Sequence, residues 1–130
     1  FNTPDLVSEA GLKYLCDWVN DDLPYAMKTR NGSVVSMPHP IDIDDYTILV
    51  QNHHTEDDFR DALIDQFNFL YRESTPEAGR IMAISLHPWV IGQPYRISAL
   101  EEALDHINSH AEVWSATGAE ILDVWLSQVG

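Results

Sequence analysis

The feature that most constrains the fold is a nearly continuous apolar run at residues 81–86, followed at once by His87 and Pro88. A run of this length predicts a strand that is covered on both faces, as in a parallel sheet with helices around it. A loop of polar and aromatic residues follows at 89–96, and a helix is expected after it. In such folds the loops at the carboxyl ends of the strands form the functional site. His87 is therefore the first candidate for a functional side chain, because an imidazole can change its charge near neutral pH.

Four helices are predicted from capping residues and from the spacing of apolar residues. The capping residues are Thr3, Thr55, Ser98 and Thr117. Each of the last three is followed three positions later by an acidic residue, which is the pattern of a capping box. The helix that Thr55 opens is the longest, and its apolar residues recur at helical spacing as Phe59, Leu63, Phe67 and Leu70. In the last helix, the residues expected to face inward are Ile121, Val124 and Trp125.

Strands alternate with these helices. Besides the central run, short strands are predicted at residues 12–16 and 112–116, and residues 25–29 and 33–37 predict a hairpin with Asn31-Gly32 as its tight turn. The alternation is typical of parallel α/β folds. Three parallel strands make only a small sheet, however, whereas barrels of this class need about 250 residues. We therefore expect one partial domain over residues 1–130, either part of a barrel or a small open sheet that a partner completes.

The composition limits the partners. The chain has 21 acidic and 7 basic residues, which gives a formal net charge of −14. Nucleic acid and anionic membranes are excluded as partners because both would be repelled, and no apolar run approaches the ~20 residues of a membrane span. The single cysteine, Cys16, permits no internal disulfide, and we expect a cytoplasmic protein. Because the sequence starts at Phe1 rather than Met, we also expect a processed chain or a piece of a longer one.

A second candidate site is the loop at residues 17–25, where carboxylates and aromatic rings gather after the strand predicted at 12–16. Asp21 and Asp22 have two interpretations at this stage: they act in a site, or they cap a solvated turn. The aromatic residues Trp18 and Tyr25, and Trp89 after His87, are as well suited to packing as to lining a pocket.

Several short motifs keep a common order along the chain. They are Asn2-Thr3-Pro4-Asp5-Leu6, Asp17-Trp18, Asn20-Asp21-Asp22-x-Pro24-Tyr25, Ser85-Leu86-His87-Pro88, Gly92-Gln93-Pro94-x-Arg96, Glu112-Val113-Trp114 and Thr117-x-x-Glu120-Ile121. In this order they resemble the C-terminal half of the polysaccharide deacetylase family, and most closely its allantoinase-like branch. The resemblance implies an α/β fold that is the C-terminal portion of a distorted (β/α) barrel with one inserted β-hairpin. It also implies a hydrolase that cuts carbon–nitrogen bonds in amides, such as the N-acetyl groups of sugars.

The resemblance assigns roles to the candidate residues. His87 matches the histidine of the family's Leu-His motif, which acts as general acid, and Asp22 or Asp21 is the carboxylate expected to orient it. The residues expected to bind a small-molecule or carbohydrate amide are Asp21, Trp18, Tyr25 and Trp89. No metal ligand is expected in this chain. In the family, an Asp and two His hold a divalent metal, zinc or similar, in the N-terminal half that is missing here, together with the catalytic base.

Other motifs indicate structure rather than chemistry. His106 and His110 lie one helical turn apart and could bind a metal, but a histidine cation near a helix carboxyl end is the plainer interpretation. Cys16 falls within an apolar strand, which favours a buried, inert thiol. The sequence has no G-x-S-x-G motif, no P-loop and no G-x-G-x-x-G motif.

Two functions remain open. In the first, the chain supplies the general acid and the pocket walls of an amide hydrolase and is inactive without the missing metal-binding half. In the second, the chain is a non-catalytic half-barrel that serves binding or assembly. It would then pair as a homodimer or with a complementing half-domain, because an incomplete sheet exposes an edge and an apolar face. The ordered motifs favour the first function, and the missing metal triad favours the second.

Overall fold

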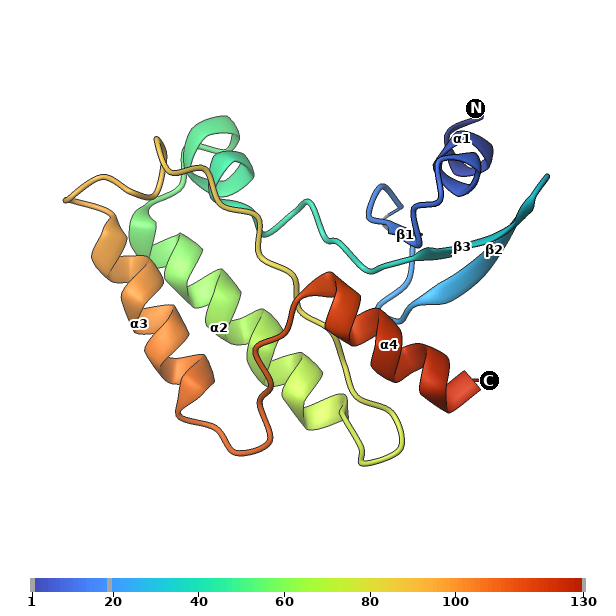
Figure 1. Cartoon of the computed structure of the whole chain (residues 1–130). Coiled ribbons are helices and arrows are strands. Elements are labelled where there is room, and N and C mark those ends of the chain that lie inside the picture. Colours follow the sequence, from blue (N-terminus) through green and yellow to red (C-terminus); the bar gives the residue numbers. More distant parts are fainter. Residues whose placement is uncertain (1, 19, 130) are drawn as a thin grey trace. The chain divides into compact units, whose positions relative to one another are not determined.

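The chain forms two compact units in the computed structural model, which describes residues 2–18 and 20–129 (Figure 1). The first unit consists of Phe1–His39 and Trp114–Gly130, and the second consists of Pro40–Val113. Helices occur in both units, and a small sheet lies in the first, so the predicted α/β class is confirmed. Within the described residues, no helix has the length and apolar character needed to cross a membrane.

The first unit is built on a sheet of three strands in the order β1-β3-β2. Its elements are α1 (Thr3–Glu9), β1 (Tyr14–Leu15), β2 (Tyr25–Thr29), β3 (Gly32–Ser36) and α4 (Gly118–Val129). Strand β1 is shorter than the strand predicted at 12–16, and it pairs in parallel with β3. Strands β2 and β3 pair antiparallel, so the predicted hairpin is present.

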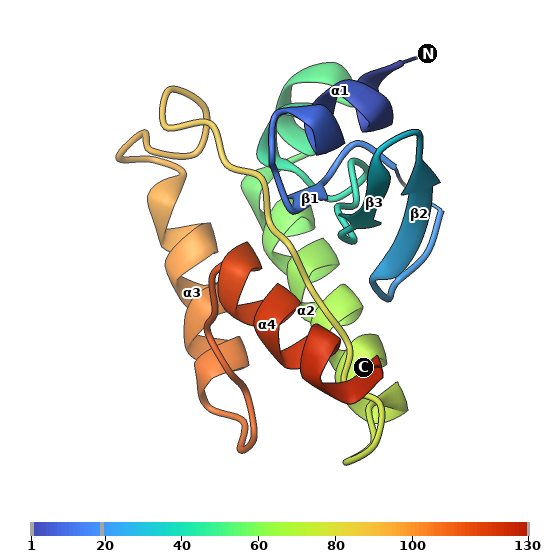
Figure 2. The same cartoon turned by 45° about the vertical axis from the view of Figure 1, so that its right-hand side comes forward.

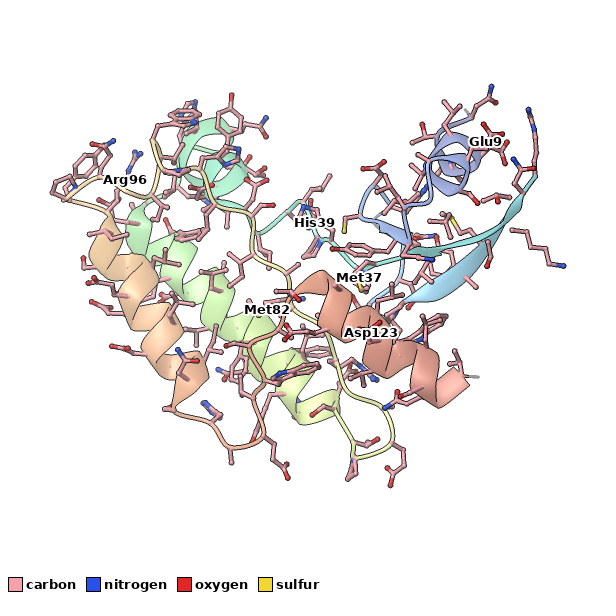
Figure 3. All side chains as sticks on the ribbon, in the orientation of Figure 1. Glu9, Met37, His39, Met82, Arg96 and Asp123 are labelled. Atoms are coloured by element: carbon pink, nitrogen blue, oxygen red, sulfur yellow. The ribbon has the colours of Figure 1, made fainter. Side chains whose placement is uncertain are left out.

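The turn of this hairpin is shifted by one residue from the prediction. Thr29 pairs with Gly32, which leaves Arg30 and Asn31 as the turn residues. Helix α1 explains the shift, because two of its carboxylates bind the turn. Asp5 accepts a hydrogen bond from the Arg30 backbone N–H at 2.8 Å, and Glu9 accepts one from the Asn31 side-chain amide at 3.1 Å. The two acids are four residues apart and therefore share one face of α1, on which Figure 3 labels Glu9.

The second unit packs two helices and one π-helical turn around an apolar core. Its elements are η1 (Tyr46–Gln51), α2 (Glu56–Glu73) and α3 (Ile97–Asn108). The buried residues of α2 are the four that the sequence predicted, Phe59, Leu63, Phe67 and Leu70. Two of them, Phe59 and Leu63, form one core cluster with Ile48, Leu49, Val90, Ile91, Leu100 and Ala103.

Helices α2 and α3 lie side by side and run in the same direction (Figures 1 and 2). Their polar contacts confirm this direction: Arg60 near the start of α2 pairs with Glu102 at 3.0 Å, and further along the Asn68 amide oxygen accepts a hydrogen bond from Nε2 of His106 at 2.8 Å. Because α2 and α3 run in the same direction, the chain must travel back from the end of α2 to the start of α3. Residues 74–96 make this return, and they carry His87.

The central strand predicted at residues 81–86 is wrong as regular structure. Within the described residues the segment pairs with no strand, and most of it is only half buried, with Leu86 exposed. Met82, labelled in Figure 3, and Ile84 pack against the core of the second unit. The apolar pattern thus predicted the contact with the core correctly. A strand also requires ladder hydrogen bonds from neighbouring strands, and these are absent from the part of the chain that the structure describes.

The strand predicted at 112–116 is also absent. Glu112 has a φ of 62°, which lies in the left-handed region and is incompatible with extended backbone.

Two of the predicted helix caps are present in the structure. Thr55 and Thr117 form reciprocal capping boxes with Asp58 and Glu120.

Two other helix starts differ from the prediction. Helix α3 begins at Ile97, before Ser98, and α1 has Asn2 at its N-cap without a side-chain cap. In α4 the buried residue is Leu122, whereas the three inward residues predicted there are not fully buried. A cap pattern or an apolar residue specifies where a helix can start or pack, and contacts with the rest of the chain decide where it does.

Removing buried volume from the core should destabilise the fold. Leu63 on α2 is fully buried, and we expect Leu63→Ala to lower the free energy of unfolding by about 2–5 kcal/mol through lost apolar burial and the cavity left behind. Leu104→Ala on α3, where the leucine is 38% exposed, serves as the control and should change it by about 0.5 kcal/mol. Urea denaturation of both variants checks this. Equal costs would contradict the position of the core.

The two capping boxes should make stability depend on acidic pH. Hydrogen bonds from Thr55, first from its side chain and then from its backbone, lower the pKa of Asp58. The backbone and then the side chain of Thr117 do the same for the pKa of Glu120. A carboxylate whose pKa is lowered by folding stabilises the fold above its unfolded pKa and loses this contribution as the pH falls through the folded pKa.

We therefore expect a double variant, Asp58→Asn with Glu120→Gln, to melt at a lower temperature than the parent chain at pH 7. The difference should shrink as the pH falls below about 4, the ordinary pKa range of carboxyl groups. Asp65→Asn, at an exposed position of α2, is the control and should melt like the parent. Melting temperatures recorded from pH 7 to pH 2 test the prediction, which a constant difference would refute.

Candidate active site

His87 stands at the start of a compact turn. Its backbone carbonyl accepts hydrogen bonds from the backbone N–H groups of Val90 at 2.7 Å and Ile91 at 3.1 Å. Both of these residues are buried in the core of the second unit, so they anchor the turn. Gly92 closes it, and a Cβ at this position would lie 2.3 Å from the Pro88 carbonyl oxygen. A glycine is therefore required at position 92. The backbone of the turn is fixed by the two buried residues and by this close approach.

Asp45 is the carboxylate that binds His87. Its Oδ1 lies 2.7 Å from Nδ1 of the His87 ring, and its Oδ2 accepts a hydrogen bond from the His87 backbone N–H at 2.8 Å. Asp45 is fully buried, whereas 40% of the His87 side chain remains exposed. An ionised carboxylate only accepts hydrogen bonds, so Nδ1 carries a hydrogen and Nε2 is the nitrogen left for exchange with a ligand.

The sequence favoured Asp22 or Asp21 as the carboxylate that orients His87. The carboxylate that binds the ring in the structure is Asp45, and a catalytic role for Asp22 or Asp21 stays a prediction. Asp45 immediately precedes η1, whose residues Ile48 and Leu49 are buried, and this packing fixes its position. No local signal marks the pair, because the two residues are 42 positions apart in the sequence. An acidic residue directly before a buried apolar segment was the one available hint.

Two aromatic rings flank the His87 ring. The centroid of Tyr46 lies 5.6 Å from that of His87, and the centroid of Trp89 lies 6.0 Å from it. Tyr46 and Trp89 are themselves 5.8 Å apart. Trp89, which the sequence placed in the substrate site, thus adjoins His87 and keeps 61% of its surface exposed. Tyr46 was not singled out from the sequence, since nothing local distinguishes it from a packing residue.

The other predicted site residues belong to the first unit. Asp21 accepts a hydrogen bond from the Leu23 backbone N–H at 3.1 Å, as expected of a turn residue, and Tyr25 donates one to Asn20 at 3.1 Å. Asp22 is exposed. Trp18 is half exposed and lines a shallow hollow with Thr3, Pro4 and Asp17. The substrate-binding roles of Asp21, Trp18 and Tyr25 and the catalytic role of Asp22 stay predictions.

His106 and His110 are packing residues. Their rings contact each other, and His110 also contacts Phe67 at 4.9 Å and Tyr71 at 5.0 Å between ring centroids. Nδ1 of His110 binds the His106 carbonyl oxygen at 2.8 Å. These contacts account for both rings without a ligand.

Two further kinds of reactive site were considered: a nucleophilic Cys16 and a metal site formed by His, Cys, Asp and Glu side chains. Cys16 is partly buried, and this burial, followed by the negative charge of Asp17, raises the pKa of its thiol. A thiol that stays protonated is a poor nucleophile. Across the described residues, no three His, Cys, Asp or Glu side chains gather in a way that could hold a metal ion.

Known proteins resemble this chain over most of its length. No protein-family model matches it. A Schizosaccharomyces pombe protein named "Putative polysaccharide deacetylase" is 30% identical over 119 residues, which are 84% of this chain and 37% of that protein. The crystal structure of Puue allantoinase superposes with a TM-score of 0.85 at 32% identity, covering 94% of this chain and 41% of the other. A Pseudomonas aeruginosa PAO1 structure described as "probable Polysaccharide deacetylase" gives 0.82 at 32% identity, covering 95% and 42%.

The resemblance predicted from the motifs is therefore confirmed in fold and in sequence. The chain spans less than half the length of each of these relatives. In sequence and in fold it is similar to part of the polysaccharide deacetylases and of allantoinase.

Proposed function

We propose that this chain supplies the proton-donating part of a hydrolase site that cuts non-peptide carbon–nitrogen bonds in amides. His87 is the general acid, and Asp45 is the carboxylate that orients it. The observation that carries the proposal is the fully buried Asp45 carboxylate bound both to Nδ1 and to the backbone N–H of a histidine whose side chain is partly exposed.

The chemistry of amide hydrolysis requires such a group. Attack on the carbonyl gives a tetrahedral intermediate, and the amine can leave only when its nitrogen receives a proton. With Nδ1 bonded to Asp45, a protonated His87 presents its second proton on Nε2. The Asp45 carboxylate, 2.7 Å from Nδ1, holds the ring in the orientation that leaves Nε2 for the leaving group. A positioned acid of this kind contributes about 10²–10⁴-fold to the rate.

The substrate contacts are proposed in two groups. Trp89 lies beside His87 with most of its surface exposed, which suits a wall against the apolar face of a sugar or another small amide. The proposed roles of the acidic-loop residues rest on the sequence alone: substrate binding for Asp21, Trp18 and Tyr25, and catalysis for Asp22.

The metal that the resemblance implies does not fit the residues at hand, because the described His, Cys, Asp and Glu side chains form no three-ligand group. We propose that the metal site lies in the part of the relatives that this chain does not span, and that hydrolysis needs that part. We also propose that this chain is one portion of a distorted (β/α) barrel, which the missing part of the relatives would complete. Residues 81–86 support it, since an apolar segment whose Met82 and Ile84 pack on the core of the second unit is suited to forming a buried strand of a larger sheet.

A chimera tests the proposal. In it, this chain replaces the matching 119-residue stretch of the S. pombe relative. With zinc or manganese added, the chimera should hydrolyse an N-acetylated sugar oligomer or allantoin. His87→Gln should lower kcat by about 10²–10⁴-fold. His54→Gln, at an exposed position before α2, is the matched control and should leave kcat unchanged.

Two outcomes would overturn the proposal. Full activity of His87→Gln would remove His87 from the reaction. A folded chimera that hydrolyses neither substrate with either metal would favour the non-catalytic module, in which this chain serves binding or assembly.

The Asp45→Asn variant should show whether Asp45 acts by orienting the His87 ring or by maintaining the fold. An asparagine keeps one oxygen for the His87 backbone N–H but replaces the charged acceptor at Nδ1, so the imidazole loses its fixed tautomer. We expect kcat of the chimera to fall by about 10²–10⁴-fold while its circular dichroism spectrum is kept. Asp42→Asn, three residues earlier and exposed, is the control. Equal kcat values for the two variants would show that the Asp45 charge has no role.

A further inference from the structure

We propose that Tyr46 is a positioning residue for His87, whose aromatic ring fixes the orientation in which Asp45 holds Nδ1. The inference rests on the proposed function, because the orientation matters when Nε2 has to meet a leaving group. Tyr46 acts through the packing of its ring, and its hydroxyl is dispensable.

The geometry places Tyr46 in a closed triangle of rings with His87 and Trp89. The Tyr46 and His87 planes are tilted by 48°, the Tyr46 and Trp89 planes by 64°, and the His87 and Trp89 planes by 71°. The three centroid separations lie between 5.6 and 6.0 Å. Tilted and edge-to-face pairs at such separations are the favoured arrangements of aromatic rings.

The imidazole needs this support because Asp45 fixes only one edge of it. The backbone bond to Asp45 Oδ2 survives any rotation of the ring, so the bond at Nδ1 alone resists a turn about the Cβ–Cγ axis. With 40% of its side chain exposed, His87 also has solvent on one side. Rings packed against its faces and edges restrict the rotation further.

Tyr46 and Trp89 differ in how firmly they are held. Tyr46 packs against the core of the second unit and begins η1, directly after Asp45. Trp89 is 61% exposed on the turn after His87. The anchored member of the pair is therefore Tyr46, and one short segment, Asp45-Tyr46, supplies both the hydrogen-bond acceptor and the wall of the histidine.

Tyr46 meets His87 and Trp89 through its aromatic ring. The ring contacts account for its interactions near His87. A phenylalanine at this position would keep every one of these contacts, whereas a leucine would keep the apolar volume toward the core and lose the ring.

Nitrogen-15 NMR of the histidine-labelled chain tests the inference without any substrate. The readouts are the tautomer-sensitive ring ¹⁵N shifts of His87 and the exchange of its Nδ1 proton with water. Tyr46→Leu should accelerate this exchange by about threefold to tenfold, the effect expected from the loss of one aromatic pair, and should move the ring shifts toward tautomer averaging. Tyr46→Phe should restore the parent values to within about twofold.

Tyr71→Leu is the matched control, because Tyr71 packs on His110 in the same unit. It should alter the His110 signals and leave those of His87 unchanged. Unchanged His87 exchange in a folded Tyr46→Leu variant would overturn the inference, and so would a Tyr46→Phe variant that behaves like the leucine variant.

A second measurement needs no variant. Nuclear Overhauser contacts between the ring protons of Tyr46 and His87 should be present in the parent chain, and their absence would also overturn the inference. Loss of the general-acid role, seen as full activity of the His87→Gln chimera, would refute the proposed function while leaving these ring measurements intact.

Discussion

The contact between Asp45 and His87 joins two segments that are distant in sequence. One carboxylate uses both of its oxygens on one residue, with Oδ1 at the ring and Oδ2 at the backbone. The carboxylate is fully buried, and a buried charge is tolerated only when its hydrogen-bonding capacity is satisfied. The start of η1 and the turn after His87 are therefore placed by the same interaction. Loss of the contact would leave a buried carboxylate without its partners.

The core of the second unit supports that contact from both ends. Ile48 and Leu49 fix the segment that carries Asp45, and Val90 and Ile91 fix the segment that carries His87. All four pack in the same cluster as Phe59 and Leu63 of α2. Apolar packing thus sets the distance between the two polar groups, and the polar pair sets the orientation of the ring. The geometry of the pair thus depends on apolar residues of the core.

The sequence predicted the local features of the fold well. The α2 stripe and the Thr55 and Thr117 capping boxes were correct, because each depends on residues within one or two helical turns. The hairpin turn was displaced by one residue because Asp5 and Glu9 of α1 bind it. The central strand did not form because a strand needs hydrogen bonds from neighbouring strands, which a local apolar pattern does not supply. The site followed the same division. His87 was singled out from its place after an apolar run and stays a prediction as a site residue, while Asp45 and Tyr46 reach it only through the tertiary packing of segments that are distant in the sequence.

The apolar segment at residues 81–86 also affects how copies of the chain behave in solution. It is uncharged and contains no proline, and Leu86 is 41% exposed, a combination that favours cross-strand stacking between molecules. Arg80 and Pro88 stand at its two ends as gatekeepers that interrupt such stacking. A net charge of −14 adds long-range repulsion between copies. Added salt screens this repulsion within about 10 Å at 0.1 M, so colloidal stability should depend on ionic strength more strongly than folding stability does.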